Sequence, residues 1–511
     1  MAQSKLPTQK DDFPKWYQSV IREAQMAENG LARGSMVIKP WGYAIWEQIQ
    51  AETDKRIKAT GHENFYFPAL APMSLLTKEA DHVEGFAPEV YEVTHAGGKE
   101  LEETLYIRPT SEAVIWETYS RWVQSYRDLP LMYNQWNNVF RAEKRSRLFL
   151  RTSEFLWQEG HTAHETQRDA VTETLSILRD VYIDTVKNKL LIPVIPGRKS
   201  ESERFPGAVE TFTIEAMMRD KKSLQAGTSH YLGQNFAKAY DVQFQTRDGG
   251  LDNPYATSWG VSTRLIGGII MTHGDDNGLR LPSAVAPRQV VIVPIYRNDD
   301  ERSGVVEKAN NIKNDLVANG LRVQVDDREE VRPGNKFFEW ELKGVPIRIE
   351  IGPRDIESGA VLVSMRAGST VEPDKRGSQK ESVNFENLSD RINEMLTQYD
   401  QALFVEARDF REDNTIRPKN YDEMKSFLND CGGYAIIPWD GSLASEAQVK
   451  SETKATIRCL PVSDKDIDLG IESGLVPKVH DEDLLDSSGS KLKCLITGND
   501  AKEIAIFSQA Y

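Results

Sequence analysis

The chain has 511 residues, of which 39% are hydrophobic and 28% charged, and its formal net charge is −15. This length exceeds what one hydrophobic core supports, so we expect about three domains of ordinary globular composition. The negative balance argues against unspecific coating of nucleic acid, although a local basic patch can still meet an RNA.

The sequence also indicates where the protein works. No apolar stretch reaches the length of a bilayer span, and the amino-terminal residues lack the apolar core of a secretory signal. Three widely spaced cysteines, Cys431, Cys459 and Cys494, are typical of free thiols in a reducing compartment. We therefore expect a cytoplasmic protein without a membrane partner.

Residues 1–284 are predicted to form an α+β domain. Apolar residues recur at helical spacing over 14–60, "NFYFPAL" favours a strand, and "TLYIRPTSEAVIWETYSRW" favours a strand, a turn and a helix. "LMYNQWNNVFRAE" and "FLRTSEFLWQEGHTA" indicate two antiparallel strands joined by a cationic loop. An amphipathic helix over 166–190 and a glycine-rich helix in "SWGVSTRLIGGIIM" follow.

The rest of the chain changes pattern twice. Residues 285–404 read as β-α-β-α-β with short apolar strands, which predicts a small α/β domain with a largely parallel sheet. From residue 405 to 511, charged helices alternate with apolar segments such as "CGGYAIIPWDG", and the chain ends on "FSQAY". This last part is predicted to be a small α+β domain.

Several short segments combine arginine with carboxylates: "FRAE", "RPTSE", "QAGTSH" and "GVSTR". None places a nucleophile beside a base, and GxSxG, HExxH and phosphate-loop motifs are absent from the sequence. A site rich in arginine without a nucleophile suits charge stabilisation in phosphoryl or nucleotidyl transfer. Taken singly, each segment has a structural explanation as a surface ion pair, helix cap, turn or packed helix. Their order and spacing together indicate one site.

In that order the segments resemble the class II aminoacyl-tRNA synthetases, and specifically prolyl-tRNA synthetases of the archaeal and eukaryotic type without an editing insertion. "GHENFYFPAL" resembles motif 1, "FRAEKRSRLFLRTSEF" motif 2 and "GVSTRLIGGIIM" motif 3, while "RPTSE", "FLWQEGH" and "QAGTSH" resemble the prolyl subgroup. The likeness extends to "VPIRIEIGPRD" and the terminal "FSQAY". It implies an antiparallel-sheet catalytic domain, an anticodon-binding α/β domain, a small C-terminal domain and a homodimer formed around Pro68.

The resemblance implies roles in binding ATP. Arg141 would bridge the α-phosphate and the amino-acid carboxylate, which aligns the reacting groups, and Arg264 would hold the γ-phosphate. Glu143 would accept the adenine amino group, and Phe155 would stack on the base. Mg²⁺ would neutralise the triphosphate. Further ATP contacts would come from Arg151, Thr152, Gln225, Thr228 and Ser262.

The resemblance also implies roles for the amino acid. Thr110 and Glu112 would receive the secondary ammonium of L-proline, because a buried cation without a partner is costly. The flat apolar ring would lie against Phe86, Trp157 and His230.

For the RNA, the resemblance implies that the cationic loop reaches the acceptor end of tRNA(Pro). Five of the eleven residues from Arg141 to Arg151 are basic, and the loop follows a strand that would line the ATP site. The contacts would be made by Lys144, Arg145 and Arg147.

Two features depart from the wider family. Many relatives hold zinc with four cysteines in the C-terminal domain, but here Asp440, Ser445 and Thr497 occupy three of those positions and only Cys494 remains. One thiolate does not make a closed tetrahedral site, so no structural zinc is expected. Only 49 residues separate Gly160 from Glu210, which is too few for an editing domain, so we expect some mischarging with alanine or cysteine.

Three alternatives stay open at this point. A threonyl, glycyl or histidyl enzyme would share the fold, but the pocket of Glu112, Trp157 and His230 suits an apolar cationic ring better. A non-catalytic paralogue would usually lack one of the two ATP arginines, and both Arg141 and Arg264 are present. An adenylating enzyme without an RNA substrate would not need the second α/β domain.

Overall fold

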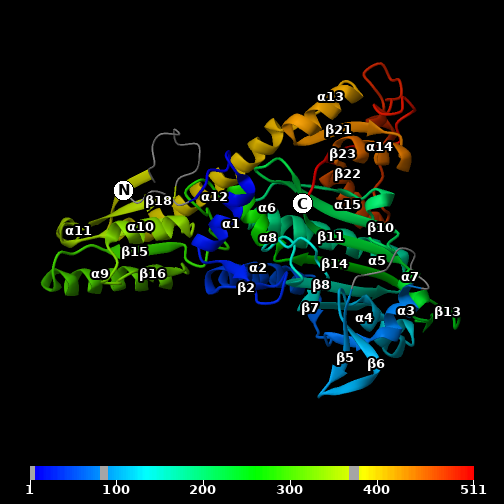
Figure 1. The fold of residues 1–511 in the computed structure, drawn as a ribbon, viewed down its shortest axis with the longest axis horizontal. Coiled ribbons are helices and arrows are strands. Elements are labelled where there is room, and N and C mark those ends of the chain that lie inside the picture. Colours follow the sequence, from blue (N-terminus) through cyan, green and yellow to red (C-terminus); the bar gives the residue numbers. More distant parts are fainter. Residues whose placement is uncertain (1–5, 81–89, 367–378) are drawn as a thin grey trace.

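The computed structural model describes residues 6–80, 90–366 and 379–511. An eleven-stranded sheet runs through the amino-terminal region and into the C-terminal one, in the order β20-β21-β23-β22-β9-β10-β11-β14-β8-β7-β3. A separate five-stranded sheet lies at the other end of the molecule (Figure 1).

The amino-terminal region contributes the larger part of the long sheet. Its strands pair antiparallel except for β3, which runs parallel to β7. The pairing of β7 with β8 confirms the two strands expected around the cationic loop. The strands are β3 (Glu63–Asn64), β7 (Leu131–Phe140), β8 (Glu154–His164), β9 (Val194–Arg198), β10 (Glu210–Met217), β11 (Ser223–Gly233) and β14 (Tyr255–Ser262).

A long helical segment packs against this sheet and confirms the helix expected over 166–190. It consists of α5 (Gln167–Ser176), the π-helical turns η2 (Ile177–Ile183) and α6 (Asp184–Asn188), and it begins where the Thr166 hydroxyl caps the backbone of Asp169. Its buried apolar side chains join the main core. The other helices of this region are α1 (Phe13–Glu23), α2 (Pro40–Ala59), α3 (Met73–Ala80), α4 (Glu112–Trp122), α7 (Asn235–Ala239) and α8 (Arg264–His273).

Two expected elements differ from the structure. "NFYFPAL" is not one strand: β3 ends at Asn64 and β4 (Leu70–Pro72) begins after Pro68, whose missing N–H cannot join a ladder. The segment read as one glycine-rich helix is strand β14 followed by helix α8. Small and large residues alternate up to Ser262, which is the period of a strand, and the helix begins only at Arg264.

Smaller sheets complete this region. The strands β4, β6 (Lys99–Ile107) and β5 (Tyr91–Ala96) form a three-stranded antiparallel sheet that projects from the body (Figure 1). Two hairpin-like pairs are formed by β1 (Ala27–Asn29) with β2 (Met36–Ile38), and by β12 (Phe244–Gln245) with β13 (Leu251–Asp252).

The second region has the expected α/β form. Strands β15 (Val290–Pro294), β16 (Val323–Val325) and β17 (Ile347–Ile351) run parallel, and β18 (Ala360–Met365) and β19 (Gln379–Asn384) complete the sheet antiparallel. The sheet is therefore mixed, with parallel pairing where the βαβ connections occur. Its helices are α9 (Asp299–Ala318), α10 (Pro333–Leu342) and α11 (Pro353–Ser358).

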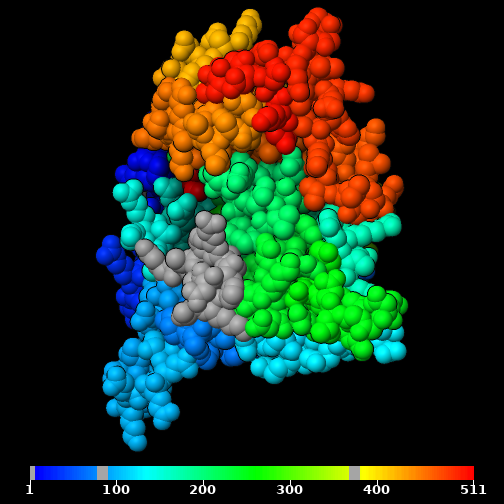
Figure 2. All heavy atoms as spheres, turned by 90° about the vertical axis from the view of Figure 1, so that its right-hand side faces the viewer, coloured from blue at the N-terminus to red at the C-terminus, as the bar shows by residue number. Residues whose placement is uncertain are grey.

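The third region follows the 26-residue helix α12 (Leu388–Asp413), which crosses the boundary expected at residues 404 and 405. Its strand β22 pairs with β9 of the first region, and Gly197 permits the close approach, since a Cβ there would lie 2.6 Å from the backbone oxygen of Leu460. The region covers one end of the amino-terminal region (Figure 2). Its other elements are β20 (Thr415–Ile416), α13 (Tyr421–Ser426), β21 (Tyr434–Trp439), α14 (Leu443–Thr453), β22 (Thr456–Pro461), α15 (Asp464–Ser473) and β23 (Glu503–Ser508).

Candidate active site

One face of the long sheet lines a cavity of about 360 Å³. Directly opposed residues of neighbouring antiparallel strands point to the same face, and Thr211, His230, Ser258 and His161 follow one another in register across β10, β11, β14 and β8. All four side chains border the cavity. The alternation of the strands therefore brings residues far apart in sequence into one site.

Most of the predicted site residues line this cavity. Arg141 follows the end of β7, and Arg264 is the first residue of α8, yet both border the same space. The predicted residues found there are Thr110, Glu112, Arg141, Phe155, Trp157, Gln225, Thr228, His230, Ser262 and Arg264.

Three predicted ATP residues lie beside the cavity without lining it. A carboxylate oxygen of Glu143 accepts a hydrogen bond from the backbone N–H of Arg145 (3.2 Å), and the Thr152 hydroxyl donates to the backbone oxygen of Glu154 (2.6 Å). Arg151 donates to the backbone oxygen of Tyr511 (3.0 Å). Their roles toward ATP stay predictions. The expected ring contact by residue 86 falls in 81–89, outside the described residues.

The cationic loop lies next to a second cavity of about 270 Å³, which the chain terminus helps to form. The guanidinium of Arg147 lies 5.6 Å from the ring centre of Tyr511. Lys144 and Arg145 are exposed. This second cavity is lined by Arg145, Ser146, Arg147, Leu150, Arg151, Lys222, Ala510 and Tyr511.

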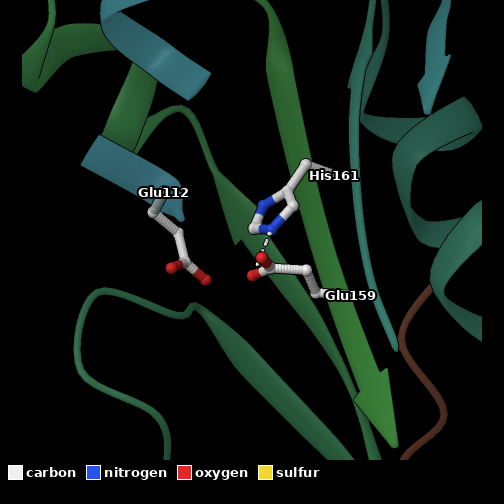
Figure 3. Close-up of side chains that lie close together, drawn as sticks. All are labelled: Glu112, Glu159 and His161. Carbon is white, nitrogen blue, oxygen red and sulfur yellow. Dashed lines mark hydrogen bonds and ion pairs between the residues drawn. The ribbon is translucent and has the colours of Figure 1, made fainter. Parts of the chain in front are cut away.

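One end of the main cavity is acidic. Glu112 opens helix α4, and Glu159 and His161 come from strand β8, with all three side chains turned toward one another (Figure 3). Ser111 stands at the cap position of α4, but its hydroxyl donates to Glu159 instead of capping the helix. Hydrogen bonds of 2.7 Å from both Gln135 and Asn137 also hold Glu159.

Glu159 and His161 are functional candidates that the sequence analysis did not single out. They belong to the quoted segment "FLWQEGH", in which every second residue of β8 faces the cavity. Phe155 and Trp157 were already assigned to the site, so continuing their alternation along the strand would have found both residues.

The acidic end suits an organic cation better than a metal ion. Ligand atoms of Glu112, Glu159 and His161 lie within 4.8 Å of one another, which a metal could bridge. Burial opposes protonation of His161, but its hydrogen bond with Glu159 and the charges of both glutamates outweigh burial and raise its pKa. A raised pKa makes the imidazole a poorer metal ligand, because the proton competes for the same nitrogen, whereas two carboxylates beside it can accept N–H groups of an ammonium.

Aromatic and neutral groups continue the lining from the acidic end. The ring of His230 lies 4.7 Å from that of Phe205, and its Nδ1 is 3.0 Å from the Thr211 hydroxyl. Burial, aided by the charges of His161 and a nearby lysine, lowers the pKa of His230 to about 3, so this imidazole is neutral. Among the described residues, Trp157 Nε1 and Ser258 Oγ are buried without a hydrogen-bond partner, which leaves them available to a ligand.

The other end of the cavity is cationic. Arg141 leads toward it from the acidic end. It donates to the backbone oxygen of Pro109 (3.0 Å), its guanidinium lies 5.3 Å from the ring centre of Phe155, and the charges of Glu112 and Glu159 oppose the lowering of its pKa by burial. Burial and the positive charges of Arg151 and Arg141 lower the pKa of Arg264 to about 10. Guanidinium groups that destabilise one another in this way are stabilised when a polyanion binds between them.

The positions that the resemblance marks for zinc form a hydrogen-bonded cluster instead. The carboxylate of Asp440 accepts from the hydroxyls of Ser445 (3.0 Å) and Thr497 (2.8 Å). Trp439 Nε1 donates to the Ser445 hydroxyl (2.8 Å), and Cys494 is buried nearby in the same core. One thiolate among hydroxyls and one carboxylate does not suit zinc, which prefers several cysteine or histidine ligands.

The fold and the cavity define a class II aminoacyl-tRNA synthetase. Residues 91–273 match the tRNA synthetase class II core domain of the G, H, P, S and T enzymes, and residues 289–395 match the anticodon binding domain. Residues 421–511 match the C-terminal domain of prolyl-tRNA synthetase. Each match lies within one of the three expected domains.

Whole-chain comparison gives the specificity of the family. The chain is 49% identical over 508 residues to a proline--tRNA ligase of Chloroherpeton thalassium, covering 99% of both chains. It is 50% identical over 501 residues to that of a Roseiflexus species (98% of both), and 47% identical over 522 residues to that of Amoebophilus asiaticus (99% of both). The chain therefore belongs to the prolyl-tRNA synthetase family. In the described residues, none of the helices has the length and apolar character needed to span a membrane.

Proposed function

We propose that this chain is a proline--tRNA ligase that activates L-proline with ATP and transfers the prolyl group to the 3′ end of tRNA(Pro). The observation that carries the proposal is the single cavity that has Arg264 at its cationic end, Glu112, Glu159 and His161 at its acidic end, and Arg141 within reach of the charges of both glutamates. A polyanion and a small cation with an apolar body fit these two ends.

At the acidic end, the secondary ammonium of proline binds between Thr110 and Glu112. The Thr110 hydroxyl donates to the Glu112 carboxylate, which fixes the acceptor oxygens before the ligand arrives. Trp157 and His230 lie against the pyrrolidine ring, and the neutral imidazole of His230 adds no charge that would repel the ammonium.

At the cationic end, Arg141 bridges the proline carboxylate and the α-phosphate of ATP, and Arg264 holds the γ-phosphate. The carboxylate then attacks the α-phosphorus, and the bond to the leaving pyrophosphate breaks. Mg²⁺ would accompany the triphosphate and neutralise part of its charge. The remaining nucleotide contacts are assigned to Glu143, Arg151, Thr152, Phe155, Gln225, Thr228 and Ser262.

For the RNA and the assembly, we assign the acceptor end of tRNA(Pro) to Lys144, Arg145 and Arg147. A homodimer would form around Pro68, since large apolar side chains are exposed there, with Tyr66 at 71% and Leu70 at 45%. The free cysteines and the proposed tRNA substrate support a cytoplasmic location.

We also infer the archaeal and eukaryotic type without an editing insertion. The residues between Gly160 and Glu210 are occupied by the end of β8, by α5, η2 and α6, and by β9, which are all parts of the core fold. Rapid hydrolysis of alanyl-tRNA(Pro) by the purified chain would contradict this inference. We propose that the C-terminal domain binds no zinc, and one equivalent of zinc found there by metal analysis would overturn that.

The experiment that tests the function is ATP–pyrophosphate exchange with each of the twenty amino acids, followed by charging of tRNA(Pro). Proline should support the fastest exchange by a wide margin. Exchange that is fastest with threonine, glycine or histidine would assign another specificity, and absence of exchange with every amino acid would favour the non-catalytic alternative.

A further inference from the structure

One wall of the main cavity is built by residues 198–206, which comprise the last residue of β9 and most of its connection to β10. Lys199, Glu203 and Phe205 border the cavity from this segment. The Phe205 ring lies against His230, and the Phe205 N–H donates to the Thr211 hydroxyl (3.2 Å), which itself contacts His230. The segment therefore forms the wall beside the proposed site of the proline ring.

The C-terminal region holds this segment at successive residues. Arg198 donates to Glu503 of β23 (2.7 Å), and the Ser200 hydroxyl donates to Glu446 of α14 (2.9 Å). The segment residues Arg198 and Ser200 are both buried, at 8% and 2% exposure. Buried polar groups are costly to leave unpaired, so these contacts fix the backbone between them.

Lys199 and Arg458 form the centre of the contact. The Lys199 ammonium donates to the backbone oxygen of Arg458 in β22 (2.9 Å) and to Glu215 of β10 (2.9 Å). Arg458 reaches the other carboxylate oxygen of Glu215 (3.2 Å) and lies 3.8 Å from Glu203. Ser223 and Thr213 also donate to Glu215. Two cations from different domains thus share one carboxylate.

Glu215 is stabilised in its ionised form by the two cations that it contacts. Burial disfavours the charged form of Glu215, but Lys199 and Arg458 outweigh burial and lower its pKa to about 2. Removing one partner of such a network leaves an uncompensated buried charge, which is far more costly than losing a surface ion pair. The ion pairs of Glu215 with Lys199 and Arg458 are therefore coupled: breaking one destabilises the other, and both join the C-terminal region to the cavity wall.

We propose that Arg458 and Glu446 are positioning residues for proline binding, through which the C-terminal domain holds the 198–206 wall against the amino-acid end of the cavity. The proposal rests on the proposed function and adds a task for a domain that lines none of this cavity itself. Neither residue lines the cavity, so their loss should act on proline affinity through the wall. The charge of Arg458 also acts on Arg264, so Glu446 is the residue whose loss leaves the ATP site and the chemical step unchanged.

The test is proline-dependent pyrophosphate exchange, with rates expressed per active site by titration of bound prolyl-adenylate. Glu446→Ala and Arg458→Gln should each raise the KM for proline about tenfold, and in Glu446→Ala the KM for ATP and the kcat should stay within about twofold. Glu446→Gln keeps the acceptor oxygen for Ser200 and should restore most of the affinity. Arg458→Lys keeps the charge beside Glu215 and should restore part of it.

The matched control is Asp440→Asn, which weakens the C-terminal domain away from the segment. A loss of domain folding would lower the active fraction in all these variants without a selective change in the KM for proline. The proposal is overturned if the KM for proline is unchanged in Glu446→Ala and Arg458→Gln, or if Asp440→Asn raises it equally. Absence of proline-dependent exchange in the unmodified protein would instead refute the proposed function.

Discussion

The acidic and cationic ends of the main cavity lie on one face of the same sheet, but the protein stabilises the buried charges at the two ends to different extents. At the acidic end, hydrogen bonds from His161, Ser111 and Asn137 outweigh burial and lower the pKa of Glu159, so the carboxylate is stabilised before any ligand binds. At the cationic end, burial and neighbouring arginines lower the pKa of Arg264. The first end is complete within the protein, whereas we propose that a bound polyanion completes the second.

The largest effect is expected from the end that the protein leaves uncompensated. Arg264→Gln should lower the kcat of pyrophosphate exchange about 1,000-fold, because a guanidinium aimed at developing phosphate charge contributes most in the transition state. Exchange kinetics at saturating ATP and proline measure this. Arg22→Gln, at a guanidinium that is 70% exposed, is the control and should leave the rate unchanged. A loss below tenfold for Arg264→Gln would place the γ-phosphate elsewhere.

At the compensated end, the expected change is in affinity. Glu112→Gln should raise the KM for proline about 100-fold, because the buried secondary ammonium loses its ionic partner. The KM for ATP, measured in the same exchange assay, should change by less than about threefold. Equal increases in the KM for proline and the KM for ATP would show that Glu112 is not specific to proline binding.

The cationic loop extends the comparison to the second step of the reaction. Arg145→Ala and Arg147→Ala should each weaken aminoacylation of tRNA(Pro) about five- to tenfold, as expected for loss of a phosphate contact. Pyrophosphate exchange should be nearly unaffected. Equal losses in both assays would assign the loop to the adenylate site instead of the RNA.

The smallest effect is expected for Asp440, a carboxylate outside the cavity, and it concerns the free energy of unfolding instead of catalysis. Hydroxyl and backbone hydrogen bonds outweigh the effect of burial on Asp440 and lower its pKa to about 2. Because the folded pKa lies below the unfolded one, the stabilisation is present above about pH 4 and is lost as the pH falls toward 2. Asp440→Asn should lower the free energy of unfolding by about 1–2 kcal/mol at pH 7.

Urea unfolding of the C-terminal region at several pH values measures this difference. The gap between Asp440→Asn and the unmodified protein should narrow as the pH falls from 4 toward 2. A gap that does not change with pH would mean that the Asp440 carboxylate is not stabilised as an anion in the folded chain.

Local sequence patterns predicted much of the fold, and most of the site residues that the resemblance implies line one cavity. Alternating residues predicted β7 and β8, helical spacing predicted the segment over 166–190, and short apolar runs predicted the parallel strands of the second region. The same patterns failed at Ser262, where strand and helix are separated by one residue, and around Pro68, where five residues separate β3 from β4. Boundaries of this kind depend on tertiary contacts that a local pattern does not contain.

The sequence by itself determined the family and predicted the two arginines and most of the acid–aromatic set that line the cavity, because short motifs at fixed spacing distinguish this family. Tertiary structure decided that β22 of the C-terminal region extends the catalytic sheet at β9 and that Arg458 shares Glu215 with Lys199. Buried ion pairing between residues more than two hundred positions apart leaves no local pattern, because its free energy arises only when folding removes both groups from water.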